Sequence, residues 1–110
     1  MAGYNIEISV DHYGNFTFEP TTLRVRGDDT VTWSSNDGNF SVMFIDGTPF
    51  EGMDQDGKEV DAMDTFGANG KQSAPRRVKR GIQGHFHYAA SVATPERVFL
   101  EAGCPEIVVN

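Results

Sequence analysis

The chain has 110 residues and a formal net charge of −7 at pH 7, with 16 acidic side chains against nine Lys and Arg. A chain of this length forms one domain around one core, so a single domain over residues 1–110 is predicted. The acidic balance disfavours nucleic acids and anionic membranes as partners, because both bind cationic surfaces.

Neither a membrane segment nor an export signal is visible in the sequence. No apolar run approaches the roughly 20 residues that cross a bilayer, and the first residues are neither basic nor apolar. Membrane insertion is therefore not expected, and a cytoplasmic location is the default expectation. Cys104 is the only cysteine, which excludes a disulfide within the chain.

The first half of the chain alternates apolar and polar residues in short runs, the pattern of half-buried strands. The first strand is predicted over residues 4–10, and the run from Phe16 to Trp33 continues the pattern, broken at Pro20 and at residues 27–29. Further strands are predicted at 23–26, 30–34 and 40–45. Trp33 is expected in the core beside three other aromatic side chains, Phe18, Phe44 and Tyr88.

The second half begins with a polar, Gly-rich stretch over residues 50–73, predicted as a long loop with a short helical turn near 60–66. Strands resume at 76–80, 84–90, 97–102 and 106–109. Short strands at this spacing favour an all-β sandwich or barrel, and no βαβ unit is indicated.

Charged residues are segregated within and after this loop. Seven acids lie between Asp46 and Asp64, whereas five bases and no acid lie between Lys71 and Arg80. One interpretation is a solvated acidic loop beside a basic edge strand whose charges discourage edge-to-edge pairing. The other is a contact surface for a protein partner or for a second copy of the chain, a homo-oligomer.

Two segments resemble the cupredoxins, the superfamily of the blue-copper proteins. The run from Phe16 to Trp33 resembles the opening of that family. Residues 84–90, Gly-His-Phe-His-Tyr-Ala-Ala, resemble its strand Gly-x-Tyr-x-Phe-x-Cys up to the last residue. The resemblance implies a Greek-key β-sandwich and an exported or periplasmic location. One departure lies at residues 27–29, where Gly-Asp-Asp replaces the usual Pro-Gly-Asp.

A type 1 copper site takes two His, one Cys thiolate and an axial Met, whose softness suits copper. The resemblance places the first His at Phe40, the Cys at Ala90 and the Met at Cys104. The second His would fall in residues 91–95, which contain none. The resemblance therefore implies vestigial copper-site positions, with Phe40 and Ala90 extending the apolar core. No cofactor is expected, and copper is the alternative.

An alternative metal site is conceivable at His85 and His87, which share one face of a predicted strand. The pair could bind a divalent metal if a third ligand converges on it. If Phe86 and Tyr88 face inward, both imidazoles face solvent. Residues 96–103, which follow this His-x-His pair, also resemble the first metal motif of cupins, although the gap to Glu96 is too long for that motif.

The sequence predicts a copper-free, cupredoxin-like module that binds a ligand or partner through the loop at 50–73 and the neighbouring basic strand. One alternative is an electron-transfer or metal-binding protein that uses His85, His87 or Cys104, and a second is a small cupin-like metal protein. No phosphate-binding glycine loop or nucleophile elbow supports an enzyme.

Overall fold

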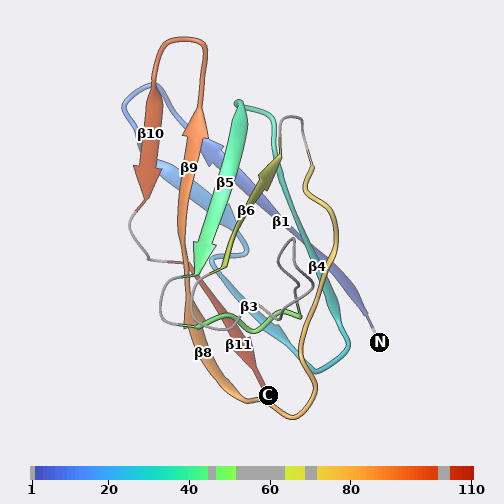
Figure 1. Cartoon of the computed structure of the whole chain (residues 1–110). Coiled ribbons are helices and arrows are strands. Elements are labelled where there is room, and N and C mark those ends of the chain that lie inside the picture. Colours follow the sequence, from blue (N-terminus) through green and yellow to red (C-terminus); the bar gives the residue numbers. More distant parts are fainter. Residues whose placement is uncertain (1, 45–46, 52–63, 69–71, 102–104) are drawn as a thin grey trace.

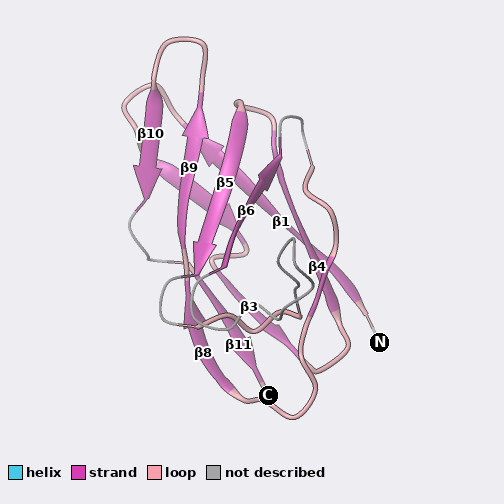
Figure 2. Cartoon of the chain, viewed as in Figure 1, coloured by secondary structure: helices cyan, strands magenta, loops and turns pink. Residues whose placement is uncertain are grey.

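A computed structural model describes residues 2–44, 47–51, 64–68, 72–101 and 105–110. All regular structure in these residues is β-strand (Figure 2), and none of them belongs to a helix that could cross a membrane. The strands are β1 (Gly3–Val10), β2 (Phe16–Glu19), β3 (Thr22–Val25), β4 (Thr30–Ser35), β5 (Asn39–Phe44), β6 (Asp64–Ala68), β7 (Arg76–Arg77), β8 (Gly84–His87), β9 (Ala89–Ala93), β10 (Val98–Glu101) and β11 (Glu106–Val109).

The strands form a β-sandwich. One sheet has the order β2-β1-β4-β7, a second β10-β9-β5-β6 and a third β3-β11-β8. In Figure 1 the strands of the second sheet run side by side, and β1 crosses behind them. β1 pairs with β4 in parallel and with β2 antiparallel, so the first half of the chain builds most of one layer. The prediction of an all-β sandwich is confirmed.

Tyr88 divides one predicted strand between two sheets. Residues 84–90 are expected as a single strand, but β8 pairs with β11 whereas β9 pairs with β5. The N–H of Tyr88 donates to the C=O of Pro105 at 3.1 Å, between the two pairings. The side chain of Tyr88 is buried at the bend and packs against Trp33 of the first sheet and Phe44 of the second.

An aromatic cluster fills the centre of the sandwich. Trp33 is fully buried, with ring centroids 5.7 Å from Tyr88 and 6.4 Å from Phe44. Phe18 joins the cluster through Tyr88, at 5.9 Å. The core position predicted for Trp33 is confirmed, and Phe50 is a further member, 5.6 Å from the same indole.

The prediction of a long loop over residues 50–73 is wrong at both ends of that segment. Phe50 is a fully buried core residue that forms a β-bridge with Val78, and Asp64–Ala68 is strand β6 rather than part of a helical turn. Ser73 is also buried, and its hydroxyl accepts the N–H of Trp33 at 3.0 Å. These pairings are non-local, so the composition of the segment does not show them. Residues 52–63 and 69–71, with most of the predicted acidic loop, lie outside the described residues.

At residues 27–29 the chain has Gly-Asp-Asp where the cupredoxin pattern has Pro-Gly-Asp, and the structure shows how this turn is built. Asp28 occupies the middle position with φ of 72°, a left-handed conformation that favours glycine. Gly27 instead lies where a Cβ would come within 3.1 Å of the Arg80 backbone. Arg80 closes the turn, since its Nε donates to Asp28 Oδ2 at 2.6 Å.

The predicted basic strand at 76–80 is shorter in the structure. β7 contains only Arg76 and Arg77, because Val78 exchanges backbone hydrogen bonds with Asp28 and Asp29 and turns inward. Its side chain is buried, so the segment has one apolar residue anchored in the core between the exposed Arg77 and the half-buried Lys79.

Candidate functional site

Phe40 and Ala90 lie on the adjacent strands β5 and β9. Phe40 is the register partner of Val92 across β5 and β9, and Ala90 is the partner of Val42. All four side chains point into the hydrophobic core, with Phe40 4% and Ala90 5% exposed. A phenyl ring and a methyl group offer no ligand atom to a metal. Cys104 lies outside the described residues.

Two glycines let the backbone close around Phe40. A Cβ at Gly67 on β6 would overlap the carbonyl oxygen of Phe40, and a Cβ at Gly38 would overlap the carbonyl oxygen of Ala93. Strands β6 and β9 therefore approach β5 and the turn before it more closely than a side chain would allow. The backbone around Phe40 is therefore closely packed.

A hairpin continues β9 beyond the position of Ala90. β9 runs to Ala93, turns through residues 94–97 and returns as β10, which pairs with β9 from Val98 to Glu101. The hydroxyl of Thr94 organises the turn: it donates to the C=O of Arg97 at 3.0 Å and accepts the N–H of Glu96 at 3.3 Å. The stretch that follows Ala90 is thus a β-hairpin.

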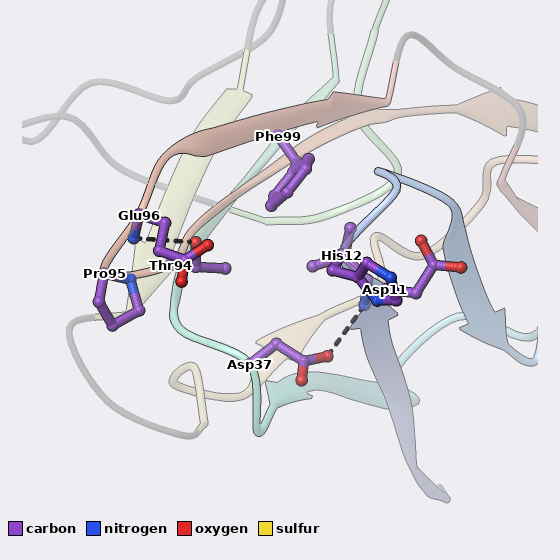
Figure 3. Close-up of a pocket in the computed structure, with 8 residues that line it drawn as sticks. Asp11, His12, Asp37, Thr94, Pro95, Glu96 and Phe99 are labelled. Atoms are coloured by element: carbon purple, nitrogen blue, oxygen red, sulfur yellow. Dashed lines mark hydrogen bonds between the residues drawn. The ribbon is translucent and has the colours of Figure 1, made fainter.

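The tip of this hairpin lines a cleft with two other turns (Figure 3). Its volume is about 270 Å³. We refer to it as the hairpin cleft, lined by Val10, Asp11, His12, Asp37, Thr94, Pro95, Glu96 and Phe99. The lining residues come from the β1–β2 turn, the β4–β5 turn and the β9–β10 hairpin, three segments distant in sequence.

Carboxylates hold the turns of the hairpin cleft in place. Asp37 Oδ2 accepts the N–H of Val10 at 2.9 Å and ties the β4–β5 turn to the end of β1. Asp11 Oδ1 accepts the N–H groups of Asn15 and Tyr13, each at 2.9 Å. The hydrogen bond from the Asn15 N–H is the main reason that the pKa of Asp11 lies below its ordinary value. Asp11 is therefore anionic at neutral pH, and Glu96 lies exposed at the same cleft.

Phe99 forms the apolar wall of the hairpin cleft. The guanidinium of Arg97 lies over its ring at 4.9 Å, and Arg97 Nη2 donates to the C=O of His12 at 3.0 Å. A Cβ on Gly14 would approach the ring at 3.2 Å, so the β1–β2 turn packs directly on Phe99. The hairpin and the β1–β2 turn are fastened together by these contacts.

A second polar cluster lies on β8 and β11. His85 and His87 are exposed on one face of β8, as the sequence predicts, while Tyr88 is buried. Glu106 Oε2 lies 3.1 Å from His85 Nδ1 and 3.3 Å from His87 Nε2. Its other oxygen accepts the hydroxyl of Thr22 at 3.4 Å.

The carboxylate of Glu106 already occupies the space between the two imidazoles. The hydrogen bond with His85 is the largest of the effects that hold the pKa of Glu106 below its ordinary value. Across the described ranges, no group of three or more His, Cys, Asp or Glu side chains is arranged to hold a metal ion. The cluster is a bridged pair of histidines in this conformation.

Two bases of the predicted basic strand make contacts within the fold. The guanidinium of Arg76 lies over the ring of Phe50 at 5.5 Å, and its Nη2 donates to the C=O of Glu51 at 3.2 Å. Arg80 pairs with Asp28. Two of the bases therefore support the turn and the edge of the sheet.

Solved structures with the same architecture are cupredoxins. A purple cupredoxin from Nitrosopumilus maritimus matches at 19% identity and a TM-score of 0.51, over 97% of this chain and 99% of that chain. The chain has the cupredoxin fold. A Sinorhizobium pseudoazurin matches at 20% identity and a TM-score of 0.51, over 100% and 75% of the two chains. An amicyanin variant in its reduced Cu(I) form matches at 17% identity and a TM-score of 0.52, over 96% and 82%.

These likenesses concern the fold alone. No protein-family model matches the sequence, and no curated protein matches it at a significant level. The cupredoxin fold decides between the two resemblances seen in the sequence, and the cupin-like alternative is wrong for this β-sandwich.

Sequence reasoning alone misses the residues of the hairpin cleft. Asp11 and His12 read only as part of a turn, and Thr94 and Phe99 give no signal of a site. The cleft exists because three turns meet in space. Glu106 is missed for a similar reason, since its place between the histidines follows from the register of β8 against β11.

Proposed function

We propose that this protein is a binding module on a cupredoxin fold that operates without type 1 copper. The observation that carries the proposal is the burial of Phe40 and Ala90 in the hydrophobic core, at the positions where the resemblance places a His and the Cys. Each is a register neighbour of an apolar β-branched residue, Val92 or Val42, so the space is filled by packing.

The β9–β10 hairpin supports the same conclusion. A type 1 site requires imidazole and thiolate ligands converging on one point. Here β9 continues past Ala90, and its backbone pairs with β5 on one side and β10 on the other. The described residues of β5, β9 and β10 therefore provide packing and backbone pairing rather than copper ligands.

The hairpin cleft is the proposed place of binding. It combines an aromatic wall at Phe99 with the carboxylates of Asp11, Asp37 and Glu96, an arrangement that favours a ligand carrying a positive charge or hydrogen-bond donors. A protein partner at the predicted acidic loop and basic strand is compatible with this proposal.

Copper titration tests the first part of the proposal. Cu(II) added to the protein is expected to produce no intense thiolate-to-copper absorption in the visible range. Weak absorption from copper bound at the His85 and His87 imidazoles should vanish in a His85→Gln/His87→Gln variant. An intense band that survives this double substitution and disappears in Cys104→Ser would overturn the proposal.

A matched pair of small probes tests the hairpin cleft. Methylguanidinium is expected to shift the backbone amide resonances of Asp37, Thr94 and Glu96, whereas acetate leaves them unchanged. Glu96→Gln should reduce the response, and Glu19→Gln, an exposed acid on β2, should not. Equal responses to both probes would remove the hairpin cleft as a cation-binding site.

The alternative of a metal-binding protein with unconventional ligands rests on His85 and His87. One observation favours it: Glu106, a third potential ligand, converges on both imidazoles. A metal would have to displace the carboxylate from its present hydrogen bond with His85. Zn(II) or Cu(II) binding that is lost in His85→Gln/His87→Gln, with the fold intact, would support this alternative.

A further inference from the structure

The β10 strand is an unpaired edge that exposes apolar side chains. It ends the sheet order β10-β9-β5-β6, and it pairs only with β9 within the described residues. Val98 is 61% exposed and Leu100 79% exposed, both on the outer face of the sheet. Such an edge is a template for pairing with another strand, and β10 contains no Lys or Pro to prevent it.

The backbone of β10 also presents hydrogen-bonding groups outward. The N–H of Thr94 donates to the C=O of Arg97 at 2.9 Å, so this pair closes the hairpin. Hydrogen-bonded and non-hydrogen-bonded pairs alternate along an antiparallel ladder. Phe99 and Glu101 therefore direct their backbone groups to β9, whereas Val98 and Leu100 direct theirs away from the sheet.

The sequence of this edge is self-complementary. Residues 97–101 read Arg-Val-Phe-Leu-Glu, and an antiparallel pairing centred on Phe99 places Arg97 opposite Glu101 of a second copy. The same pairing places Val98 opposite Leu100, the two residues whose backbone groups are free to exchange hydrogen bonds. Opposite charges and apolar pairs facing each other across strands are each stabilising.

We infer that the protein forms a symmetric dimer in which two β10 strands pair antiparallel about Phe99, joining two four-stranded sheets into one. The contact is isologous, so each copy contributes the same Arg97, Val98, Leu100 and Glu101. It buries a short edge and a few side chains, which is less than a standard interface, and the dimer is accordingly weak and salt-sensitive. This self-pairing requires neither copper nor a ligand in the hairpin cleft, although Phe99 also lines that cleft and Arg97 also contacts the Phe99 ring.

Charge-swap variants test the register of the pairing. Glu101→Arg places two arginines opposite each other and Arg97→Glu places two glutamates opposite each other, so each variant alone should be monomeric. An equimolar mixture of the two restores both ion pairs and should form a heterodimer, as should the Arg97→Glu/Glu101→Arg double variant with itself. Glu7→Arg, which makes the same charge change on β1, should dimerise like the parent protein.

Sedimentation velocity up to about 1 mM measures the association, and circular dichroism confirms that each variant is folded. Hydrogen exchange adds a register-specific readout: the amides of Val98 and Leu100 gain protection with concentration, whereas that of Phe99 is protected throughout. A parent protein that stays monomeric at every concentration, or single variants that still dimerise, would overturn the inference.

Discussion

Phe40 and Val92 face each other across β5 and β9 as register partners, and their side chains are 4% and 0% exposed. Phe40 has a backbone carbonyl that touches β6 at Gly67, where no side chain would fit. Phe40, one of these two apolar residues, stands at the position where the resemblance to blue-copper proteins places an imidazole. Its stabilising role can be measured directly.

Phe40→Ala is expected to lower the free energy of unfolding by about 3–5 kcal/mol, because it removes a buried aromatic side chain and leaves a cavity. Chemical denaturation measures the loss. Asn39→Ala is the matched control, an exposed residue on the same strand, and should stay within about 0.5 kcal/mol of the parent. A loss below about 1 kcal/mol for Phe40→Ala would show that the position is not part of the core.

Trp33→Ala is expected to cost a similar amount, about 3–5 kcal/mol, because the indole is fully buried among Phe44, Phe50 and Tyr88. Loss of the near-ultraviolet circular dichroism of the remaining aromatic residues should accompany it. Tyr13→Ala, on a side chain that is 79% exposed, provides the comparison and should be nearly neutral. Equal effects of the two substitutions would contradict the central place of Trp33.

Local patterns predict the strands that alternate along their own length. Ile6 and Ile8 share a buried face of β1, and Trp33 is buried on β4, as the period of two requires. Phe50 is different. It is an isolated aromatic residue in a polar stretch, and its bridge to Val78 and its packing on Trp33 and Phe44 make it a core residue. No local period can show such contacts.

The candidate site can be predicted from the sequence only in part, for the same reason. The absence of ligand side chains at Phe40 and Ala90 follows from the sequence once the strands are aligned with the cupredoxin pattern. The hairpin cleft does not, because Asp37 reaches the end of β1 and Arg97 reaches His12 through contacts between distant turns. The sequence does not predict the bend at Tyr88 either, because the Pro105 carbonyl that accepts its N–H lies far along the chain.

Gly38→Ala is expected to destabilise the protein by about 1–3 kcal/mol, because the added methyl group would overlap the carbonyl of Ala93 and push β9 from the β4–β5 turn. Thermal and chemical unfolding measure the effect. Gly3→Ala is the control, since its methyl group would meet only the hydroxyl of Thr30 at 3.4 Å, an ordinary contact. A neutral Gly38→Ala would show that the hairpin accommodates a wider spacing.

Asp29 links the stability of the fold to pH. Its side chain is buried, and its two oxygens accept the N–H of Arg26 at 2.9 Å and the N–H of Ala2 at 2.8 Å. The hydrogen bond from Arg26 is the largest effect, and it holds the pKa of Asp29 below the ordinary value even though burial acts in the opposite direction. The folded state therefore favours the ionised carboxylate.

A carboxyl group whose pKa is lower in the folded state stabilises the protein above its unfolded pKa, which is about 3.9 for aspartate, and loses this contribution as the pH falls through the folded pKa. Asp29→Asn should therefore be less stable than the parent at pH 7, and the difference should shrink below about pH 4 as the parent itself becomes protonated. Chemical denaturation of both proteins between pH 7 and pH 3 gives the comparison. Glu19→Gln removes the same charge from an exposed side chain and reports the effect of net charge alone. If the difference between parent and Asp29→Asn is the same at pH 7 and pH 3, the carboxylate of Asp29 does not stabilise the turn through its charge.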